Sequence, residues 1–597
     1  MAETINALFC TAVSRYGARP ALSHKEHGQY VHLAYGELAE QVRQFASGLV
    51  AAGVNAGDRL ALISENRPEW VIADLSMLAL GAVSVPLFAT LPAAQVAFMV
   101  ADSGSRVLLV SDSHQRDKAL EVRRSIPDLI VIAMEGEPNT LNGVMTFADV
   151  MERGGAALLS QEEFRAQQRA VGRDDLASIV YTSGTTGNPK GVMLSHGNLA
   201  ANVEACQEAL CFAPEDVLLS FLPLNHCLER TAGYYLPLSC GCQVAYAESL
   251  RRLRENIREV RPTYMIVVPR LLESFQEAIE DRVAKARPLR QRLFEWALAT
   301  GRERTSRIQA GRQASLWSGL CRSLADQAIL GKVRDAAGLG RMKAFVAGGA
   351  PLAADTGWFF HALGVPVLEG YGLSETSPVV TFNRPRRFRL GTVGQPLVGV
   401  EVRIGAAGEI LCRGPNVMQG YHNRPEETAA TLDPEGWLHT GDVGDLDADG
   451  FLRITDRIKD LLVLTNGKKV APQPIESLLK TSPYISQAVL VGDQRPTVAA
   501  LIVPAFDRVR EWGAQQGLKL PEAHAQMARD DQVIGLVRSE IDRLSADLAD
   551  FERIHGFALL DREFTVEGRE LTPTFKVRRR VVAEKCADLI SELYPSR

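Results

Sequence analysis

The chain has 597 residues and a mass of 65.2 kDa, a length that exceeds one compact core and predicts at least two domains. Its 66 basic and 71 acidic residues give a net charge of −5, which argues against an extended nucleic-acid-binding surface, so we expect no nucleic-acid partner. Hydrophobic residues make up 46% and charged residues 23%, as in ordinary globular proteins, and long disordered tracts are therefore disfavoured.

The sequence favours a cytoplasmic, reducing compartment. Its first residues, MAETINALFCTAVSRYGARP, lack a basic segment followed by an apolar one, so no secretory signal is expected. No window reaches the roughly 18 apolar residues that a membrane span needs. Nine cysteines without a Cys-x-x-Cys pair predict neither a disulfide scaffold nor a zinc site, and we interpret Cys240 and Cys242 as apolar residues of a buried strand.

The N-terminal third alternates short apolar runs with helical patterns. Residues 59–64 and 106–111 are predicted as buried strands, and residues 45–52 and 70–80 as helices. This alternation is typical of parallel sheets built from βαβ units with right-handed crossovers. After a further apolar run at 176–181, a helix is expected to open at Ser195 and to continue through Leu210.

Residues 270–340 differ in composition from the preceding part, because arginines recur among spaced leucines, phenylalanines and tryptophans. The pattern predicts long amphipathic helices with basic outer faces. Two interpretations stay open for these faces. They are either solvated helix surfaces, or they attract anionic lipid or a phosphorylated ligand.

Strand-like runs return further along the chain, at 342–346, 365–368 and 409–412. The charged segment 456–460, DRIKD, separates two regions of different texture, and beyond it strands within 488–503 accompany a helix at 531–548. We therefore expect an N-terminal domain of residues 1–456 and a C-terminal domain of residues 457–597.

The strongest local signal is the segment 181–191, YTSGTTGNPKG. Its glycines allow backbone N–H groups to converge on phosphate oxygens, its Ser and Thr hydroxyls add donors, and Lys190 adds a cation. It is not a Walker A loop, since five residues after Gly184 stands Pro189 instead of a Gly-Lys-Ser/Thr run. A plain flexible turn does not explain so many phosphate-binding groups, so the segment predicts a phosphate loop.

The segment YTSGTTGNPKGVMLSHGNL resembles the signature of the adenylate-forming acyl-CoA synthetase superfamily. Further matching segments follow in family order over about 400 residues: GGAP at 348–351, EGYGLSE at 369–375, GWLHTGD at 436–442, DRIK at 456–459 and LTPTFK at 571–576. The segment DRIKDLLVLTNGKKVAP is similar to the long-chain fatty acid–CoA ligase type. The resemblance implies an α/β fold, with a large N-terminal adenylate-forming domain of βα subdomains and a small, mobile α+β C-terminal domain.

The resemblance also assigns residues to substrates. It implies magnesium contacts by Thr185 and Glu375, and ATP or AMP contacts by the following residues: Thr182, Ser183, Gly184, Thr185, Thr186, Lys190, Gly349, Ala350, Pro351, Gly370, Tyr371, Gly372, Ser374, Asp442 and Arg457.

Several of these assignments also have a physical basis in the sequence. Tyr371 stands between two glycines, which suits stacking on a planar base, and Glu375 offers the hard oxygen that magnesium prefers. The Asp442 carboxylate is suited to accepting both ribose hydroxyls, and Arg457 adds donors. The alternative for Asp442 and Arg457 is a mutual surface ion pair, which would contribute little to stability.

Lys576, Glu375 and His226 are the candidates for catalysis, and Lys459 is a candidate hinge residue. The resemblance implies that Lys576 stabilises the charge that develops when a carboxylate attacks the ATP α-phosphate. The arginines at 578–580 after it are either a solvated helix end or a contact for CoA phosphates. His226, in LPLNHCLER, is implied to border the acyl pocket and CoA tunnel, against the alternative of a structural histidine, and Lys459 stands at the implied hinge.

Together these expectations describe an enzyme. It would use ATP, Mg2+ and coenzyme A to convert a fatty acid, by implication a long-chain one, into acyl-AMP and then into acyl-CoA. The alternatives are an acyl-AMP ligase, a carboxylate–CoA ligase with a medium-chain or aromatic substrate, or a non-catalytic nucleotide-binding protein. The sequence leaves open whether the chain forms a homodimer and whether it touches the inner membrane face as a peripheral protein.

Overall fold

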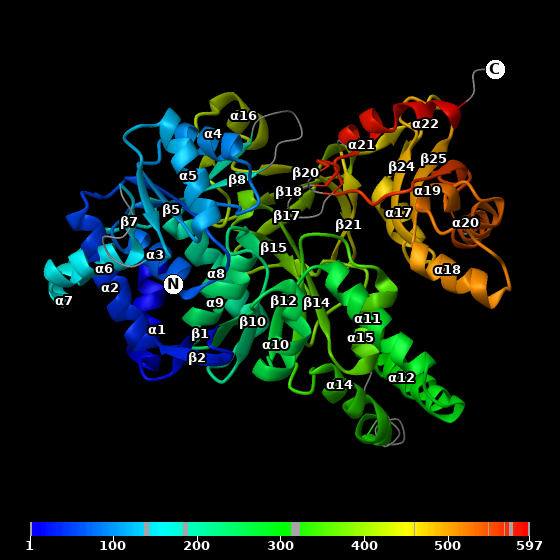
Figure 1. Cartoon of the computed structure of the whole chain (residues 1–597), viewed down its shortest axis with the longest axis horizontal. Helices are drawn as coiled ribbons and strands as arrows, with labels where there is room; N and C mark the ends of the chain where they lie inside the picture. The colour runs from blue at the N-terminus through cyan, green and yellow to red at the C-terminus, as the bar shows by residue number, and fades with distance from the viewer. Residues whose placement is uncertain are drawn as a thin grey trace.

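The computed structural model describes residues 3–136, 143–182, 189–311, 323–458, 460–546, 548–565, 568–571 and 577–594. Figure 1 shows a large α/β part and, at the right of the view, a smaller part made of the C-terminal elements. Two large sheets and a smaller antiparallel sheet build the first part, and a three-stranded sheet builds the second. The predicted α/β class with a large N-terminal and a small C-terminal domain is confirmed.

One sheet of the large part has the strand order β19-β9-β8-β4-β3-β5-β6-β7. Its strands β3 to β8 pair in parallel, as the βα alternation predicts. The strands are β3 (Arg59–Ile63), β4 (Val83–Leu87), β5 (Val107–Val110), β6 (Ile130–Ala133), β7 (Met145–Thr146), β8 (Leu176–Thr182), β9 (Lys190–Ser195) and β19 (Gly420–Tyr421). Helix α2 (Tyr35–Ala51) precedes these strands, and the helices between them are α3 (Pro68–Ala79), α4 (Ala93–Ser103), α5 (Ser113–Ser125), α6 (Phe147–Ala156) and α7 (Gln161–Ala170).

Strand β9 of this sheet was not predicted from the sequence. We expected the glycine-rich segment to lead towards a helix, and α8 (His196–Leu210) does open at Ser195, whose side chain accepts a hydrogen bond from Asn198 N. Between the two, however, lies β9, which pairs antiparallel with β8. The segment therefore closes a β-hairpin and does not lie at a helix N-terminus.

The second sheet has nine strands in the order β16-β15-β14-β13-β12-β10-β11-β1-β2. Its strands are β1 (Pro20–Glu26), β2 (Gln29–Ala34), β10 (Val217–Ser220), β11 (Gln243–Tyr246), β12 (Tyr264–Val267), β13 (Ala344–Ala347), β14 (Val367–Gly372), β15 (Val379–Phe382) and β16 (Gln395–Pro396). Helices α1 (Ile5–Tyr16), α9 (Leu236–Ser239), α10 (Leu253–Val260) and α15 (Ala354–Leu363) accompany it. Cys242 is buried as expected, but it lies in the turn before β11 and not within a strand.

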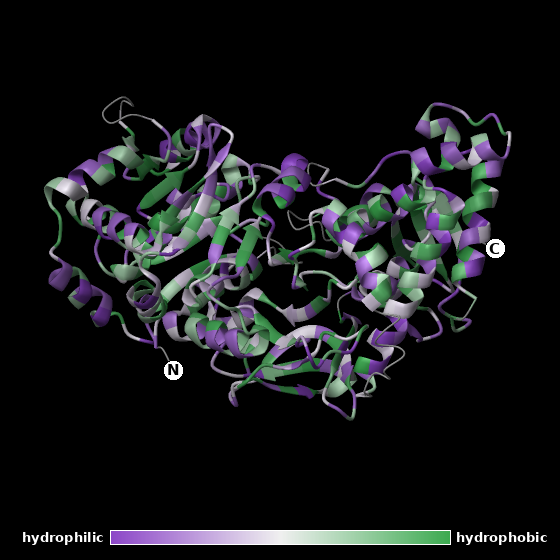
Figure 2. Ribbon diagram, turned by 90° about the horizontal axis from the view of Figure 1, so that it is seen from below, coloured by the Kyte–Doolittle hydropathy of each residue, from purple (hydrophilic) through white to green (hydrophobic). Residues whose placement is uncertain are grey.

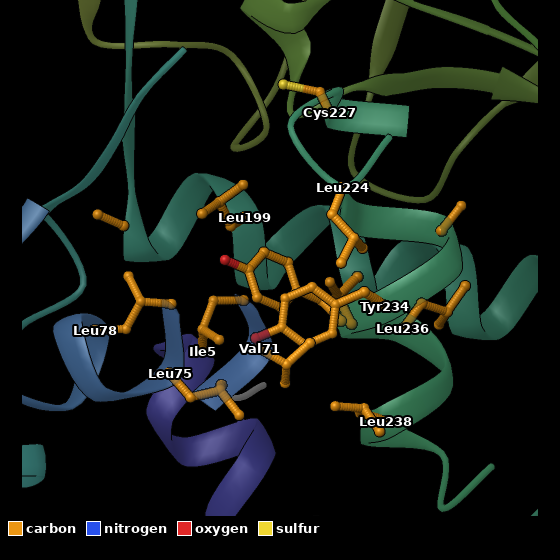
Figure 3. Packing of buried hydrophobic residues seen from close by; sticks show 14 of the residues in the cluster. Ile5, Val71, Leu75, Leu78, Leu199, Leu224, Cys227, Tyr234, Leu236 and Leu238 are labelled. Atoms are coloured by element: carbon orange, nitrogen blue, oxygen red, sulfur yellow. The ribbon is translucent and has the colours of Figure 1, made fainter. Parts of the chain in front are cut away.

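The main hydrophobic core joins the two large sheets. It contains Leu60 of β3 and Leu368 of β14 together with side chains of α1, α3 and α8, all almost completely buried. Figure 3 shows part of it, where residues of α1 and α3 pack around Tyr234. Strands buried on both faces explain the uninterrupted apolar runs in the sequence, which appear as green strands inside the molecule in Figure 2.

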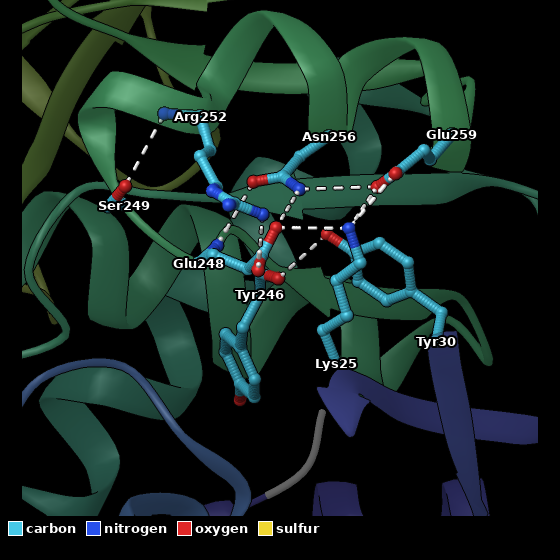
Figure 4. Close-up of polar contacts among 8 residues, drawn as sticks. All are labelled: Lys25, Tyr30, Tyr246, Glu248, Ser249, Arg252, Asn256 and Glu259. Atoms are coloured by element: carbon cyan, nitrogen blue, oxygen red, sulfur yellow. Dashed lines mark hydrogen bonds and ion pairs between the residues drawn. The ribbon is translucent and has the colours of Figure 1, made fainter. Parts of the chain in front are cut away.

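The β1–β2 hairpin is tied to this sheet by a polar cluster (Figure 4). Lys25 of β1 pairs with Glu248 at 3.0 Å and with Glu259 at 2.9 Å, although its own side chain is only 8% exposed. Asn256 of α10 donates to Glu248 at 2.9 Å, which completes the cluster. The N-terminal hairpin is thereby held by residues that follow it by more than 200 positions.

The predicted arginine-rich helices are present as α11 (Pro269–Ala284) and α12 (Pro288–Gln309), followed by α14 (Gly331–Ala337). The inner face of α12 buries Phe294, Ala297, Gly301 and Thr305. Gly301 is required there, because a Cβ at this position would lie 2.2 Å from the Ala362 carbonyl oxygen of α15.

A four-stranded antiparallel sheet completes the large part, with β17 (Glu401–Ile404), β18 (Glu409–Arg413), β20 (Leu438–Leu446) and β21 (Leu452–Arg457). Helix α16 (Pro425–Thr431) follows β19. The predicted domain boundary between residues 456 and 457 falls at the end of β21.

The small part has its own core. Its two hydrophobic clusters consist of residues between Leu462 and Tyr594. Its elements are β22 (Leu462–Val463), β23 (Lys469–Val470), α17 (Pro472–Leu479), β24 (Ile485–Val491), β25 (Val498–Pro504), α18 (Phe506–Gln515), α19 (His524–Met527), α20 (Asp531–Leu544), β26 (Ile554–Leu559), α21 (Arg579–Lys585) and α22 (Ala587–Glu592). The helix predicted at 531–548 is shorter, because α20 is capped at Ser545. Across the described residues, no helix has the length and apolar character needed to cross a membrane.

Candidate active site

The candidate site takes its residues from all three sheets of the large part: the β8–β9 hairpin, β14, and the pair β20–β21. Strand β8 ends at Thr182 and β9 begins at Lys190, and these two residues pair directly across the hairpin. The loop that joins them carries Ser183, Gly184, Thr185 and Thr186, which lie outside the described residues. The hairpin therefore fixes where the predicted phosphate loop leaves and re-enters the sheet.

Lys190 and Glu375 are brought together through one tyrosine. The Lys190 ammonium forms an ion pair with Glu427 of α16 and lies 5.2 Å from the centre of the Tyr421 ring. The hydroxyl of Tyr421 donates a hydrogen bond of 2.8 Å to Glu375 Oε1. The Tyr421 side chain thus contacts both Lys190, a cation suited to phosphate, and Glu375, a carboxylate suited to a metal.

The surroundings of Glu375 suit a magnesium ion bound with ATP. Glu375 lies in the helical turn Ser374–Thr376 after β14, and its backbone carbonyl accepts a hydrogen bond from Met418 N at 2.9 Å. Within the described residues, no group of three or more His, Cys, Asp or Glu side chains forms a metal cage. One carboxylate is the donor set expected when substrate phosphates and water supply the other oxygens.

Tyr371, Asp442 and Arg457 form a connected set. The Tyr371 hydroxyl donates to Asp442 Oδ2 at 2.6 Å, and Arg457 Nε donates to Asp442 Oδ1 at 2.8 Å. Burial, and then the Asp442 charge, holds the pKa of the Tyr371 hydroxyl well above its ordinary value. The expected alternative, an Asp–Arg ion pair, is therefore present. It is a half-buried pair, because the Asp442 side chain is only 5% exposed and that of Arg457 is 41% exposed.

The glycines beside Tyr371 act through the space that they leave for a neighbouring strand. Neither has a positive φ, so neither supplies left-handed flexibility. A Cβ on Gly372 would lie 1.7 Å from the Pro378 carbonyl oxygen, and one on Gly370 would lie 2.8 Å from Phe382. Both positions need glycine because β14 packs closely against β15.

The segment 348–351 follows β13 and reaches the same region. A Cβ on Gly348 would lie 3.3 Å from Leu228 and 3.6 Å from the Gly370 carbonyl oxygen. Gly349 has a φ of 84°, so the chain turns there before Ala350 and Pro351. The structure thus brings this loop beside the glycine-tyrosine segment of β14, as expected for parts of one site.

His226 lies at the edge of this region. Its Nδ1 accepts a hydrogen bond from Leu228 N at 3.2 Å, and its ring centre lies 6.5 Å from that of Phe88. Burial raises the pKa of the neighbouring Cys227 thiol to about 11, against the opposing effect of a hydrogen bond with Ser374. The segment around His226 therefore packs against the turn that carries Ser374 and Glu375.

Comparisons with known proteins decide the family. A model of the AMP-binding enzyme matches residues 9–422, and a model of the AMP-binding enzyme C-terminal domain matches residues 459–597. The chain belongs to the AMP-binding enzyme family. The resemblance to the adenylate-forming acyl-CoA synthetase superfamily is confirmed, and the protein is an adenylate-forming, ATP-binding ligase.

Relatives of this adenylate-forming ligase cover nearly all of it. It is 35% identical over 575 residues to the long-chain-fatty-acid–CoA ligase FadD15 of Mycobacterium bovis, with 95% of this chain and 93% of that protein covered. It is 31% identical over 622 residues to the human long-chain-fatty-acid–CoA ligase ACSBG1, with 99% and 85% covered.

Solved structures share the fold of the ligase. The adenylation domain of a carboxylate reductase from Mycobacterium chelonae matches with a TM-score of 0.76 at 23% identity, over 99% of this chain and 91% of that one. ATP-bound MatB from Rhodopseudomonas palustris matches with a TM-score of 0.70 at 24% identity, over 98% and 99%. At these identities the likeness establishes the fold alone.

Two lysines predicted for the ligase, Lys459 and Lys576, lie outside the described residues. The segment that carries Lys576 is nevertheless anchored at both ends. Leu571 and Val577 form an antiparallel bridge, and Arg578 N donates to the Glu570 carbonyl oxygen at 2.7 Å. The Glu570 carboxylate, only 1% exposed, pairs with Arg562 at 2.7 Å and Lys585 at 2.9 Å.

The arginines that follow Lys576 have separate environments in the ligase. Arg579 is largely buried, and its guanidinium forms a two-pronged pair with Glu476 of α17, with Nη2 at 2.8 Å from Oε2. Arg580 is exposed and pairs with Glu584 at 2.8 Å. Arg579 therefore holds α21 to α17, whereas the solvated interpretation suits Arg580.

The sequence did not identify Tyr421 and Glu427 as site residues of the ligase, because neither belongs to a segment with a recognisable chemical pattern. It also left Glu229 and Arg230 without roles. Arg230 is buried, pairs with Asp74 and donates to Ser178 Oγ at 2.7 Å. Ser220 Oγ donates to Glu229 at 2.6 Å, and burial raises the pKa of that carboxyl to about 8.

Proposed function

We propose that the enzyme is a fatty acid–CoA ligase that forms AMP, with a long-chain fatty acid as its substrate. The carboxylate would attack the α-phosphate of ATP to give acyl-AMP and pyrophosphate, and the CoA thiol would then attack the acyl carbon to give acyl-CoA and release AMP. The observation that carries the proposal is the convergence of the Lys190–Tyr421–Glu375 and Tyr371–Asp442–Arg457 sets in one region. The names of the full-length relatives support the substrate class.

Each set has a part in binding ATP under this proposal. Lys190 would meet phosphate oxygens together with the hydroxyls of Thr182, Ser183, Thr185 and Thr186, and Ser374 would contact the α-phosphate. Asp442, oriented by two hydrogen bonds, would accept the ribose hydroxyls, while Tyr371 and the 349–351 loop would border the adenine.

Glu375 and Thr185 would hold the magnesium ion. When bound, magnesium would neutralise phosphate charge and so favour departure of pyrophosphate. The hydroxyl of Tyr421 keeps one oxygen of the Glu375 carboxylate in a fixed direction, towards the side of the site where Lys190 lies. Tyr421 is therefore a positioning residue for this carboxylate.

The C-terminal domain, assigned to residues 457–597, would supply the remaining group. Lys576 would stabilise the negative charge that grows during adenylation, and Lys459 would serve as the hinge about which this domain turns before the thioester step. His226 would border the route of the acyl chain and the CoA thiol. A tunnel that binds alkyl chains gains roughly 0.8 kcal/mol per buried methylene, which favours long chains.

The test measures both half-reactions with purified enzyme. ATP, magnesium, CoA and a panel of fatty acids should yield AMP, pyrophosphate and acyl-CoA, with the highest kcat/KM for long chains. Highest kcat/KM for medium-chain or aromatic acids would overturn the long-chain assignment. Release of pyrophosphate at the same rate without CoA, with acyl-AMP as the product and no thioester formed when CoA is present, would instead identify an acyl-AMP ligase.

Lysine variants then test whether Lys576 and Lys459 serve different half-reactions. Lys576→Ala should abolish acyl-AMP formation yet largely retain thioester formation from supplied acyl-AMP, and Lys459→Ala should impair the thioester step more than adenylation. Lys469→Ala, an exposed lysine of β23, is the matched control and should leave both steps unchanged. Equal losses in both steps for Lys576→Ala would contradict its proposed role.

A further inference from the structure

Helix α12 has an apolar outer face. Leu289, Leu293 and Trp296 are 70%, 42% and 43% exposed, and Leu289 has the largest exposed fraction among the exposed large hydrophobic side chains of the described residues. Their spacing of four and then three residues places them on one side of the helix, roughly a third of a turn from the side that buries Phe294, Ala297 and Gly301. We call Leu289, Leu293 and Trp296 the apolar ridge.

Basic side chains surround the apolar ridge. Between residues 285 and 309 the chain has seven lysines and arginines but only two glutamates, although its overall net charge is −5. Arg292 lies one turn before Trp296, and Arg304, eleven residues after Leu293, continues the stripe of Leu293. Both arginines are exposed. One of the two glutamates, Glu303, is already neutralised by Arg307 at 2.6 Å.

The position of the helix leaves this face accessible. Figure 1 shows α12 in green at the lower right, on the periphery of the molecule. Its inner side packs on α15 through Gly301, whereas the side chains of the ridge are exposed. The hairpin of α11 and α12 also begins directly after β12, whose last residue, Val267, accepts a hydrogen bond from Gly348 N of the site.

We propose that the apolar ridge and the arginines around it dock the enzyme on an anionic lipid bilayer. Exposed leucines and a tryptophan on a helix that lies parallel to the surface enter the boundary between headgroups and acyl chains. Arginines beside them pair with phosphate headgroups while their alkyl stems cover apolar surface. A protein partner would need a matching acidic groove, whereas a bilayer offers apolar depth and negative charge in one plane.

The inference does not depend on the proposed reaction, so its test measures binding alone. Full-length enzyme is sedimented with vesicles of phosphatidylglycerol and phosphatidylcholine in equal parts, and with pure phosphatidylcholine, at about 0.05 M and about 0.5 M salt. The protein should bind the anionic vesicles, bind the neutral ones at least about fivefold more weakly, and lose affinity at high salt. The emission of Trp296 should shift to shorter wavelength on binding.

Two pairs of variants test which side chains bind the vesicles. Leu289→Ser with Trp296→Ser should lower the partition coefficient about tenfold or more, whereas Leu250→Ser, on a leucine that is 65% exposed elsewhere, should leave it unchanged. Arg292→Gln with Arg304→Gln should lower it about fivefold per arginine and weaken its salt dependence, and Arg580→Gln is the exposed control. Because these side chains are exposed, thermal unfolding should stay as in the wild type.

Two outcomes would overturn the proposal. One is unchanged vesicle binding in the Leu289 and Trp296 double variant. The other is a concentration-dependent dimer in the absence of lipid that the same double variant abolishes, since the ridge would then be an interface between two copies of this chain.

Discussion

At the scale of single residues, the most informative side chain of the site is Tyr421. Its ring lies beneath the Lys190 ammonium and its hydroxyl binds Glu375, so one residue touches both the proposed phosphate cation and the proposed metal carboxylate. The phenol cannot act as a base near neutral pH, because burial and then the Glu375 charge hold its pKa well above the ordinary value. Its contribution is to hold the other two groups in place.

This role predicts the effect of Tyr421→Phe. The variant keeps the ring under Lys190 but removes the hydrogen bond to Glu375, so the carboxylate loses its fixed direction. We expect the magnesium concentration for half-maximal activity to rise about tenfold, within the range seen when residues that orient a metal ligand are changed. KM for ATP measured at saturating magnesium should change little.

Tyr594→Phe is the matched control for this measurement. Its hydroxyl donates to backbone carbonyls at 3.1 Å and 2.9 Å within the C-terminal domain, far in sequence from the site. An unchanged magnesium dependence in Tyr421→Phe, or an equal change in Tyr594→Phe, would contradict the positioning role.

At the scale of elements, the pairing of β14 with β15 supports the site more than any loop described here. Gly370 and Gly372 allow the two strands to approach, and this approach places Tyr371 where its hydroxyl reaches Asp442. The glycines act through the absence of a side chain and not through an unusual backbone conformation.

A pair of glycine variants separates these two effects. Gly372→Ala would place a methyl group against the Pro378 carbonyl, so we expect a loss of about 1–3 kcal/mol in the free energy of unfolding and a rise in KM for ATP. Gly535→Ala, in the interior of α20 with no atom within 4 Å of the new Cβ, should instead gain about 1 kcal/mol. Urea denaturation checks both, and a neutral Gly372→Ala would be inconsistent with the close strand contact.

Some elements of the fold were predictable from the sequence and others were not. Residues 59–64 and 106–111 were predictable as parallel strands because both of their faces are buried, which leaves an apolar run. Strand β9 was not, since its first residues belong to the glycine-rich segment and its exposed and buried positions do not alternate cleanly. The buried Glu229 and Arg230 were not predictable either, because burial of a charge depends on partners such as Asp74, which is far away in the chain.

The same limit applies within the site. Tyr371, Asp442 and Arg457 belong to recognisable segments and are predictable from the sequence, and the structure brings them into contact. Tyr421 and Glu427 enter the site only because β19 pairs with β9, an antiparallel contact between segments more than 200 residues apart. A single sequence contains no local sign of that pairing.

At the scale of the whole molecule, the two parts have separate hydrophobic cores. A destabilising substitution in one part should therefore increase local unfolding in that part alone. Glu570 offers a test, because its partners Arg562 and Lys585 both belong to the C-terminal part. Despite the opposing effect of burial, hydrogen bonds from Arg562 and Lys585 lower the pKa of the Glu570 carboxyl to about 2. The ionised form is thus favoured by folding.

The sign of the pH effect follows from that shift. A carboxyl whose pKa is lower in the folded state contributes stability above its unfolded pKa of 4.5, and this contribution is lost as the pH falls towards 2. Glu570→Gln should therefore destabilise the C-terminal part at pH 7 and make its stability less sensitive to acid. Hydrogen exchange resolved by segment should show faster exchange in β24 and β25 with no change in β3 and β5.

Glu563→Gln is the matched control, since this exposed carboxylate accepts a hydrogen bond from Ser486 at 2.9 Å and no ion pair with another described residue is seen. Faster exchange throughout both parts in Glu570→Gln would show that the two cores unfold as one unit.

The register of the β8–β9 hairpin has a mechanical consequence. Lys190, Val192 and Leu194 lie on the same side of β9, and the last two are completely buried. Sliding the strand by one residue would move these two side chains to the opposite face of the sheet and turn the Lys190 ammonium with them. The position of Lys190 is thus set by the buried side chains of β9 and not by the loop before it. Residues inserted between Thr182 and Lys190 would lengthen the loop between β8 and β9 but leave the Lys190 ammonium in place.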